Sequence, residues 1–296
     1  MQIHKIFNIT PYSGSFSSCL DETGAGYVVA ILKATFRFSD TAVISVVTGE
    51  NVVPIFTQDI FYGDPVSSRL RYPSDNVPRR RGTDIILNGQ AYGHGKRPIT
   101  AGFRVGNVVK QIMVSGFRHY DISGNSDRHR EPAAFQSIPL HSENASGGSD
   151  VEKNSEGSVA AVIGAIPTSC PQRYKFSGTY DEKWLQTRNP LFPLDFDERF
   201  YNGVPQDQVH APKLTGGEMI VLDNVHPRNP HIQLEIPRLS FTTKFHIKDD
   251  VTLVPMVMDQ LLIEPDESRF VLTFRSSHPI GDDWQYLRSV YFESTK

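Results

Sequence analysis

Residues 28–38 read VVAILKATFRF, a sequence in which chemical character repeats every two residues. Every even position is apolar. The odd positions are apolar at first and then become Lys33, Thr35 and Arg37. Successive side chains of a strand point to opposite faces. The pattern therefore predicts a β-strand whose first half is buried on both faces and whose second half turns one face to water.

The same period of two returns along the rest of the chain, at 231–236, 241–247 and 269–275, which we also expect to be strands. Gly106-Asn107 separates two strand-like runs and predicts a tight hairpin. Helical periodicity is confined to Asp181–Arg188, where Thr179 and Glu182 have the spacing of a capping box. Shorter candidate strands lie at 42–47, 84–92, 99–105, 108–115, 172–177, 217–222, 257–263 and 285–292.

Strands without long helices between them indicate antiparallel pairing. We expect an all-β fold: an antiparallel sandwich or curved, barrel-like sheets, with one or two short helices and long irregular loops. Residues 142–158 are almost entirely polar, which predicts a mobile loop. That loop divides the chain into 1–141 and 159–296, which form either one large β domain over 1–296 or two subdomains.

Composition excludes several classes of protein. The chain has 296 residues and a net charge of −3, which gives no overall attraction to nucleic acid. Its two cysteines, Cys19 and Cys170, cannot form a disulfide framework. The N-terminus lacks the apolar core of a signal peptide, and no apolar run is long enough to span a membrane. We expect a cytoplasmic protein without a cofactor or a membrane partner.

Two sets of residues suggest chemistry, and for each the structural explanation is preferred. Asp195 and Asp197 flank Phe196, so in an extended chain their carboxylates share a face and can bind a cation or perform acid–base catalysis. Arg188 and Arg199 are close enough in sequence to neutralise them. The histidines lack metal-ligand spacing and are expected to be solvated or structural, not ligands. The candidates are His94, His119, His129, His141, His210, His226 and His231.

Between residues 69 and 81 five arginines stand against one aspartate, Asp75. Prolines in this stretch predict an extended, exposed loop, which either docks an acidic partner or is simply a solvated basic loop. Residues 178–208 are rich in aromatic side chains and proline, and they either pack on the sheet or form a binding surface. From both stretches we expect these residues to contact a partner: Arg69, Arg71, Tyr72, Arg79, Arg80, Arg81, Trp184, Arg188, Phe192, Phe200 and Tyr201.

These two stretches also resemble the signatures of a known family. The first signature runs from Leu70 to Asp84, and the second from Gly178 to Gln208. The strands at 29–38 and 263–275 resemble the family's first and last strands. We expect a structural role for these signature residues: Pro73, Ser74, Asp75, Gly82, Thr83, Asp84, Gly178, Thr179, Tyr180, Asp181, Asp195, Asp197, Asn202, Asp207 and Gln208.

The family is a domain of unknown function found beside genes for type VI secretion effectors. Its members are regarded as adaptors or chaperones that load a toxic effector onto the secretion spike. The resemblance implies an adaptor in the cytoplasm of a Gram-negative bacterium, with the effector and the spike protein VgrG as partners. It supplies no catalytic motif. Two alternatives remain: a carbohydrate-active or other hydrolase that uses Asp195 and Asp197 in a cleft, and a structural component of the spike or baseplate.

Overall fold

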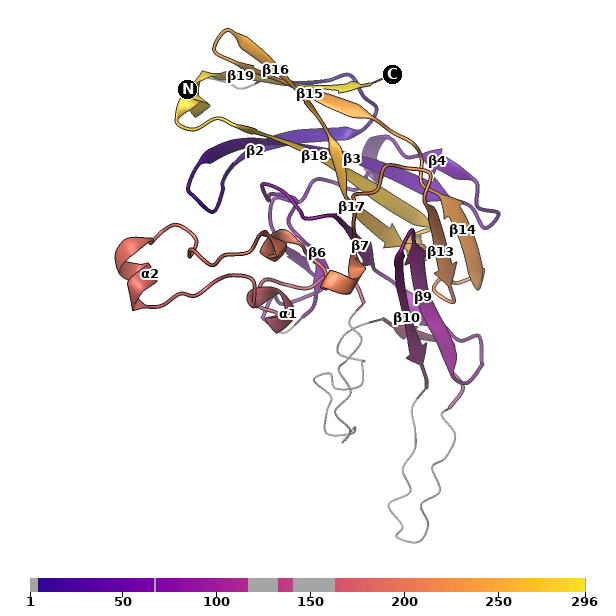
Figure 1. The fold of residues 1–296 in the computed structure, drawn as a ribbon. Coiled ribbons are helices and arrows are strands. Elements are labelled where there is room, and N and C mark those ends of the chain that lie inside the picture. Colours follow the sequence, from indigo (N-terminus) through magenta and orange to yellow (C-terminus); the bar gives the residue numbers. More distant parts are fainter. Residues whose placement is uncertain (1–4, 67, 117–132, 141–162, 296) are drawn as a thin grey trace.

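The computed structural model describes residues 5–66, 68–116, 133–140 and 163–295. The loop expected at 142–158 lies outside these residues, as do His119, His129 and His141. Within the described part, the chain is mostly β-strand with short helices, as the sequence predicts (Figure 1).

The stretch at 28–38 lies within the longest described strand, β3, which is next to the edge of the largest sheet (Figure 1). Among the described residues this central sheet contains seven strands. In spatial order they are β12 (Val209–His210), β7 (Thr83–Leu87), β17 (Val257–Glu264), β18 (Arg269–Pro279), β3 (Gly26–Phe38) and β2 (Ser13–Leu20), and β4 (Ile44–Val46) pairs with the end of β3.

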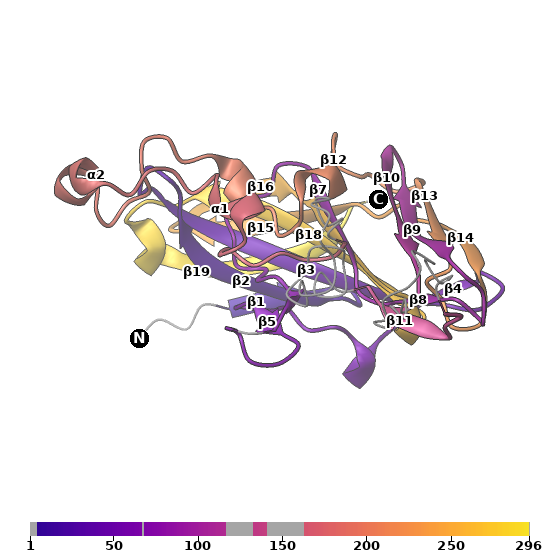
Figure 2. The ribbon, with the colours of Figure 1, turned by 90° about the horizontal axis from the view of Figure 1, so that it is seen from below.

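Two further sheets pack against one face of the central sheet (Figure 2). The first contains β1 (Lys5–Asn8), β19 (Leu287–Ser294), β15 (Phe241–Ile247) and β16 (Asp250–Pro255). The second contains β10 (Val108–Val114), β9 (Ile99–Val105), β13 (Met219–Asp223) and β14 (His231–Glu235). Two short pairs complete the strands that the structure describes: β11 (Ser137–Pro139) with β8 (Gln90–Tyr92), and β5 (Ile60–Phe61) with β6 (Leu70–Tyr72).

The even-numbered side chains of β3 face the main core, as predicted. Phe36 stacks on Phe270 of β18, with ring centroids 5.2 Å apart, and both rings are buried. The predicted hairpin at Gly106 joins β9 to β10, where Val105 pairs with Val108. Strands from residues 1–141 and 159–296 share the sheets, since β3 pairs with β18 and β9 with β13. The two segments therefore contribute to one continuous core.

The other face of β3 is buried too, which corrects the prediction that its second half is half wet. Lys33 and Thr35 are each 1% exposed, and of the three polar positions only Arg37 is exposed. Residues that lie outside the sheet cover this face: Val53 donates its backbone N–H to Thr35 Oγ1 over 3.0 Å. Irregular chain covers this face, and the residue pattern of a strand does not reveal such a cover. This is the physical reason for the difference.

Three further expectations need correction. Residues 172–177 do not form a strand, because α1 (Pro171–Tyr174) begins there with a proline in its first turn. The predicted helix is present as α2 (Glu182–Thr187), but Asp181, not Thr179, caps it by accepting the N–H of Trp184. Pairing is antiparallel except between β7 and β17 and between β1 and β19, which run parallel, among the strands described.

Short 3-10 helices complete the regular structure of the described chain: η1 (Gly49–Asn51), η4 (Glu198–Tyr201), η5 (Gln206–Gln208), η6 (Pro265–Glu267) and η7 (Asp283–Tyr286). Over the residues described, no helix combines the length and the hydropathy needed to cross a bilayer.

The stacked rings at the centre of the core provide a test of the fold. Phe270→Ala removes a ring that is 0% exposed, so the free energy of unfolding should fall by about 3–5 kcal/mol. Urea denaturation measures the change. Val66→Ala is the control, because Val66 is 96% exposed and its loss should cost less than about 0.5 kcal/mol. Equal losses in the two variants would contradict the proposed core.

Candidate partner-binding surface

The two signature stretches meet on the second face of the central sheet. Asn202 Nδ2 donates to Asp84 Oδ1 over 2.6 Å, and the backbone N–H of Gly203 donates to Asp84 Oδ2 over 2.7 Å. Arg79 pairs with Glu198 at 2.9 Å. We call residues 69–82 and 163–208 together the covering layer. Contacts between its two parts fix them to one another as well as to the sheet.

A set of buried charges joins the covering layer to the sheet. Lys33 Nζ of β3 lies 2.6 Å from Asp75 Oδ2. Arg80 Nε lies 3.1 Å from Asp84 Oδ2 of β7. Arg275 Nε of β18 lies 2.5 Å from Asp259 Oδ2 of β17. These six side chains, each no more than 2% exposed, form the buried charge cluster: Lys33, Asp75, Arg80, Asp84, Asp259 and Arg275.

The cations of the cluster also bind backbone carbonyl groups of the covering layer. Arg275 Nη1 donates to the carbonyl oxygens of Asp75 and Val77 over 2.6 and 2.9 Å. Arg80 Nη2 donates to the carbonyl of Ser74 over 2.9 Å. Arginine is suited to this task, because its planar fork presents several donors at once. The cluster therefore holds the backbone of the first signature against the sheet.

Burial and pairing act in opposite directions on the pKa values of the cluster. Burial lowers the pKa of Lys33, although Asp75 opposes the shift. Burial alone would raise the pKa of Asp259, but Arg275, Arg80 and Lys213 lower it overall. Burial raises the pKa of Asp84 despite the neighbouring Arg80. The charges face one another inside the protein, which favours a structural role for the cluster.

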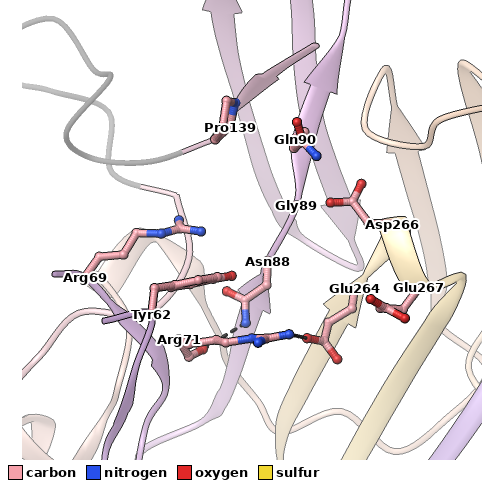
Figure 3. Close-up of a pocket in the computed structure, with 10 residues that line it drawn as sticks. All are labelled: Tyr62, Arg69, Arg71, Asn88, Gly89, Gln90, Pro139, Glu264, Asp266 and Glu267. Atoms are coloured by element: carbon pink, nitrogen blue, oxygen red, sulfur yellow. Dashed lines mark hydrogen bonds and ion pairs between the residues drawn. The ribbon is translucent and has the colours of Figure 1, made fainter. Parts of the chain in front are cut away.

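The expectation of an exposed basic loop at 69–81 is wrong for most of its residues. Arg80 belongs to the cluster, and Tyr72 is buried with its hydroxyl donating to Glu264 over 2.6 Å. Arg79 is half-buried between Glu22 and Glu198. Arg69 and Arg71 line a cavity, with acidic residues on its other side (Figure 3). Of the five arginines, all within the described chain, Arg81 alone is exposed. Each of the others meets an acidic or carbonyl group of this protein.

Signature glycines stand where the backbone leaves no room for a side chain. Gly82 has φ +91°, and an added Cβ would lie 2.7 Å from the carbonyl oxygen of His210. Gly178 has φ +85°, and its Cβ would lie 2.8 Å from Pro193. Other signature residues are bonded within the protein. Thr83 Oγ1 donates to the carbonyl of Met258, and the backbone N–H of Ser74 donates to Asp59. Asp207 pairs with Lys110, Gln208 accepts the N–H of Gly164, and Pro73 is buried beside Gly203.

Residues 178–195 form an arm that reaches away from the sheets, with α2 at its tip (Figures 1 and 2). Thr179 closes its base by donating its backbone N–H and its hydroxyl to Asp195 over 2.9 and 2.7 Å. Arg188 Nη2 donates to the carbonyl of Glu22, in the turn between β2 and β3, over 2.9 Å. Trp184 Nε1 donates to the carbonyl of Leu191 over 2.8 Å. These bonds shape the arm and attach it to the body.

The two aspartates of the hydrolase alternative are both engaged. Asp195 accepts both bonds from Thr179, which lower its pKa. Asp197 is paired with Arg199 at 2.5 Å, and this bond lowers the pKa of Asp197. Contrary to expectation, Arg188 donates to the backbone carbonyls of Phe192 and Glu22 instead of pairing with either aspartate. A glycosidase requires two carboxylates that face one pocket. The observed bonds favour the structural explanation.

The aromatic rings of the second signature mostly pack on one another. Phe196 lies 4.2 Å from Phe192, 5.8 Å from Phe200 and 5.3 Å from Tyr201, measured between ring centroids. Tyr201 is buried and the others are half-buried. Trp184 is half-buried as well, with Tyr180 against it at 4.7 Å. These rings build the covering layer more than they display a surface.

The apolar side chains that do reach solvent here escaped the sequence analysis. Leu185 and Leu194 of the arm are 58% and 80% exposed. Leu20, at the end of β2, is 61% exposed and lines a cavity of about 190 Å³ with Tyr27 and Trp284. Figures 1 and 2 place the arm, the β2–β3 turn and η7 at one end of the molecule. We call Leu20, Tyr180, Leu185, Leu194 and this cavity the apolar end.

Each of the four described candidate histidines contacts other groups of the protein. His210 Nδ1 lies 2.6 Å from the carbonyl of Pro212, and His231 Nδ1 lies 2.7 Å from Asp223. His94 stacks near Tyr92. His226 is buried, its Nδ1 accepting the N–H of Asn229 over 3.1 Å. In the part of the chain that the structure describes, no three metal-ligating side chains gather into a site.

The buried charge cluster yields a prediction about stability. Asp84→Asn leaves Arg80 without its closest carboxylate. The new side-chain amide also places N–H donors where a carboxylate oxygen accepted the bond from Asn202 Nδ2. The free energy of unfolding should therefore fall by about 3–5 kcal/mol. Chemical denaturation measures this. Lys248→Met is the control, because it breaks an exposed pair with Asp283, and should change stability by less than about 1 kcal/mol. A wild-type stability in Asp84→Asn would show that the cluster does not hold the layer.

A second prediction concerns pH. Burial lowers the pKa of His226 below its ordinary 6.5, although Asp40 opposes the shift. As the pH falls through 6.5, the unfolded chain takes up a proton before the folded chain does, so stability falls until the folded pKa is passed. Urea denaturation between pH 7 and 5 should show a smaller pH-dependent loss for His226→Gln than for the wild type. Parallel curves would contradict a shifted pKa.

Comparison with known proteins places the chain in a family. No curated protein and no solved structure matches it. A family model described as an uncharacterized protein conserved in bacteria (DUF2169) matches residues 23–161 and 151–275. These ranges include both signatures and the central sheet except β2 and the end of β18. The chain belongs to this bacterial family, DUF2169.

Proposed function

We propose that this protein is an adaptor, or dedicated chaperone, that binds a type VI secretion effector in the bacterial cytoplasm and presents it to the spike protein VgrG. The observation that carries the proposal is the apolar end: exposed leucines on a projecting arm that is anchored to a rigid sheet. The two signatures support the type VI assignment through their resemblance to effector-associated proteins.

The composition of the apolar end suits binding to another polypeptide. Interface centres are apolar and are surrounded by polar rims. Leu185 and Leu194 are flanked by Glu182, Lys183 and Asp195, which would remain hydrated at the edge of a contact. Exposed apolar side chains on a projecting segment are groups that a partner would cover.

The attachment of the arm lowers the cost of binding. A segment that must become ordered on binding loses conformational entropy at that moment. Here Thr179, Arg188 and Trp184 already fix the arm through bonds to Asp195, Glu22 and Leu191. A partner that binds the arm only when folded is stabilised by mass action, which is the thermodynamic content of a chaperone role.

Co-purification with the product of the adjacent effector gene tests the proposal. Leu185→Asp and Leu194→Asp place a charge at the centre of the contact and should each weaken binding about tenfold or more. Leu253→Asp is the matched control, because Leu253 is also 58% exposed but lies on β16, which is not part of the arm. The affinity can be measured by calorimetry with the purified pair.

Two outcomes would contradict the proposal. Equal binding by wild type and both arm variants would remove the apolar end from the contact. Stable self-assembly of the purified chain into rings or rods, without affinity for an effector, would favour the spike or baseplate alternative. Arg81→Glu adds a further readout, since reversing an exposed charge at an interface rim changes mainly the association rate.

A further inference from the structure

The sheet β1-β19-β15-β16 ends in a strand that exposes apolar side chains to solvent. Among the described strands, β16 pairs with β15 and has no neighbour on its other side. Val251 and Leu253 of β16 are 48% and 58% exposed. Figure 1 shows the β15–β16 hairpin at the top of the view, away from the arm. An open strand edge presents backbone groups that can pair with another strand.

The register of the hairpin determines which backbone groups of β16 face outward. In an antiparallel pair, opposite residues alternate between a pair that shares two hydrogen bonds and a pair that shares none. Met256, which continues the register of β16, donates its N–H to the carbonyl of Phe241 over 2.9 Å. Counting back by two, the even-numbered residues of β16 bond to β15. The N–H and C=O groups of Val251 and Leu253 therefore point to the open side.

Edge strands of the two sheets that flank the main core differ in how they are protected. Charged side chains on an edge strand, lysine above all, discourage pairing with another chain. Lys5 lies on β1, Lys110 on β10 and Glu235 on β14. The charged residue of β16 is Asp250, at its first position, and the next four residues are uncharged. The edge of β16 can therefore accept a strand without burying a charge.

We propose that β16 pairs with β16 of a second copy of this chain, antiparallel across a two-fold axis. Opposite side chains lie on the same face of a sheet, so Val251 must meet an odd-numbered residue. In the central register Val251 lies opposite Leu253 of the second copy, and Thr252 lies opposite its own counterpart. The outward N–H and C=O groups then form four hydrogen bonds. A two-fold contact closes after two copies, unlike the contacts of rings or rods.

Shifting the two copies by two residues gives a poorer fit in either direction. If Leu253 met its own counterpart, Val251 would meet Pro255, which has no N–H to donate. If Val251 met its own counterpart, the acidic Asp249 would lie opposite the apolar Leu253. The central register matches the apolar side chains twice and places no acidic residue opposite another. Because β16 is its own complement, a second copy is a better match than a strand of a different protein.

Sedimentation velocity of the purified full-length chain tests the inference. The wild type should dimerise with a Kd of about 100 μM or tighter, since one strand edge is a small contact. Val251→Lys should weaken dimerisation about tenfold or more, because the ammonium group loses hydration when the strands pair. Val109→Lys is the matched control, because Val109 is 51% exposed but lies on β10. Thermal melting verifies that each variant is folded.

A cysteine on the axis tests the register. Thr252 and its counterpart form a pair without shared hydrogen bonds, whose Cα atoms lie about 4.5 Å apart, within the range of a disulfide. Thr252→Cys should therefore give a disulfide-linked dimer under mild oxidation. Asp250→Cys should not, because its Cα lies roughly 14 Å from its counterpart. The wild type, which keeps Cys19 and Cys170, gives the background.

This inference does not depend on the proposed adaptor function, and effector binding separates the two. Leu253→Asp should abolish dimerisation and keep the effector, whereas Leu185→Asp should do the reverse. A wild type that stays monomeric at about 500 μM would overturn the inference. Equal dimerisation of Val251→Lys and wild type, or equal cross-linking of Thr252→Cys and Asp250→Cys, would overturn it too. If the wild type is monomeric and Val251→Lys loses the effector, the edge binds a strand of the effector instead.

Discussion

The second face of the central sheet carries charges that the fold must neutralise, and much of the architecture follows from this constraint. Lys33 and Arg275 stand on strands where water cannot reach them, and an unpaired buried charge costs several kcal/mol. Asp75 reaches Lys33 from the covering layer, while Arg80 reaches back to Asp84. One pair has its cation on the sheet and the other has its cation on the covering layer, so the layer fits against the sheet in one register only. Pairing thus gives specificity of assembly as well as stability.

This arrangement explains why the family signatures are polar although they are buried. Asp84 of the first signature is the point at which Asn202 and Gly203 of the second attach, so the two stretches form one unit. The arm begins and ends within the second stretch, and Arg188 joins it to the turn near Glu22. The signatures therefore determine where the apolar end projects, even though most of their residues do not reach the surface.

Sequence periodicity predicts the strands well but does not predict that the second face of the central sheet is buried, and both results have one physical reason. Alternation reports which side of a strand is apolar, and the even positions of β3 do face the main core. A polar side chain such as Lys33 looks the same whether water or Asp75 satisfies it, so burial by a distant loop leaves no local signal. The same holds for the basic stretch, where Arg80 was expected to be exposed. Leu185 and Leu194 stand in an irregular, proline-rich segment whose pattern does not separate exposed from buried positions.

The central sheet is poorly suited to transmitting a signal from the apolar end to its opposite end, because buried pairs fix the register of its strands. Coupling between distant sites requires a part of the structure that both ligands bias between two states. β18 and β3 pair along eleven residues, and the buried charge cluster ties both strands to the covering layer midway. Sliding these strands would separate Lys33 from Asp75 and Arg275 from Asp259 at once. A sheet fixed in this way is suited to holding a partner in place at the apolar end, and not to passing a signal along its strands.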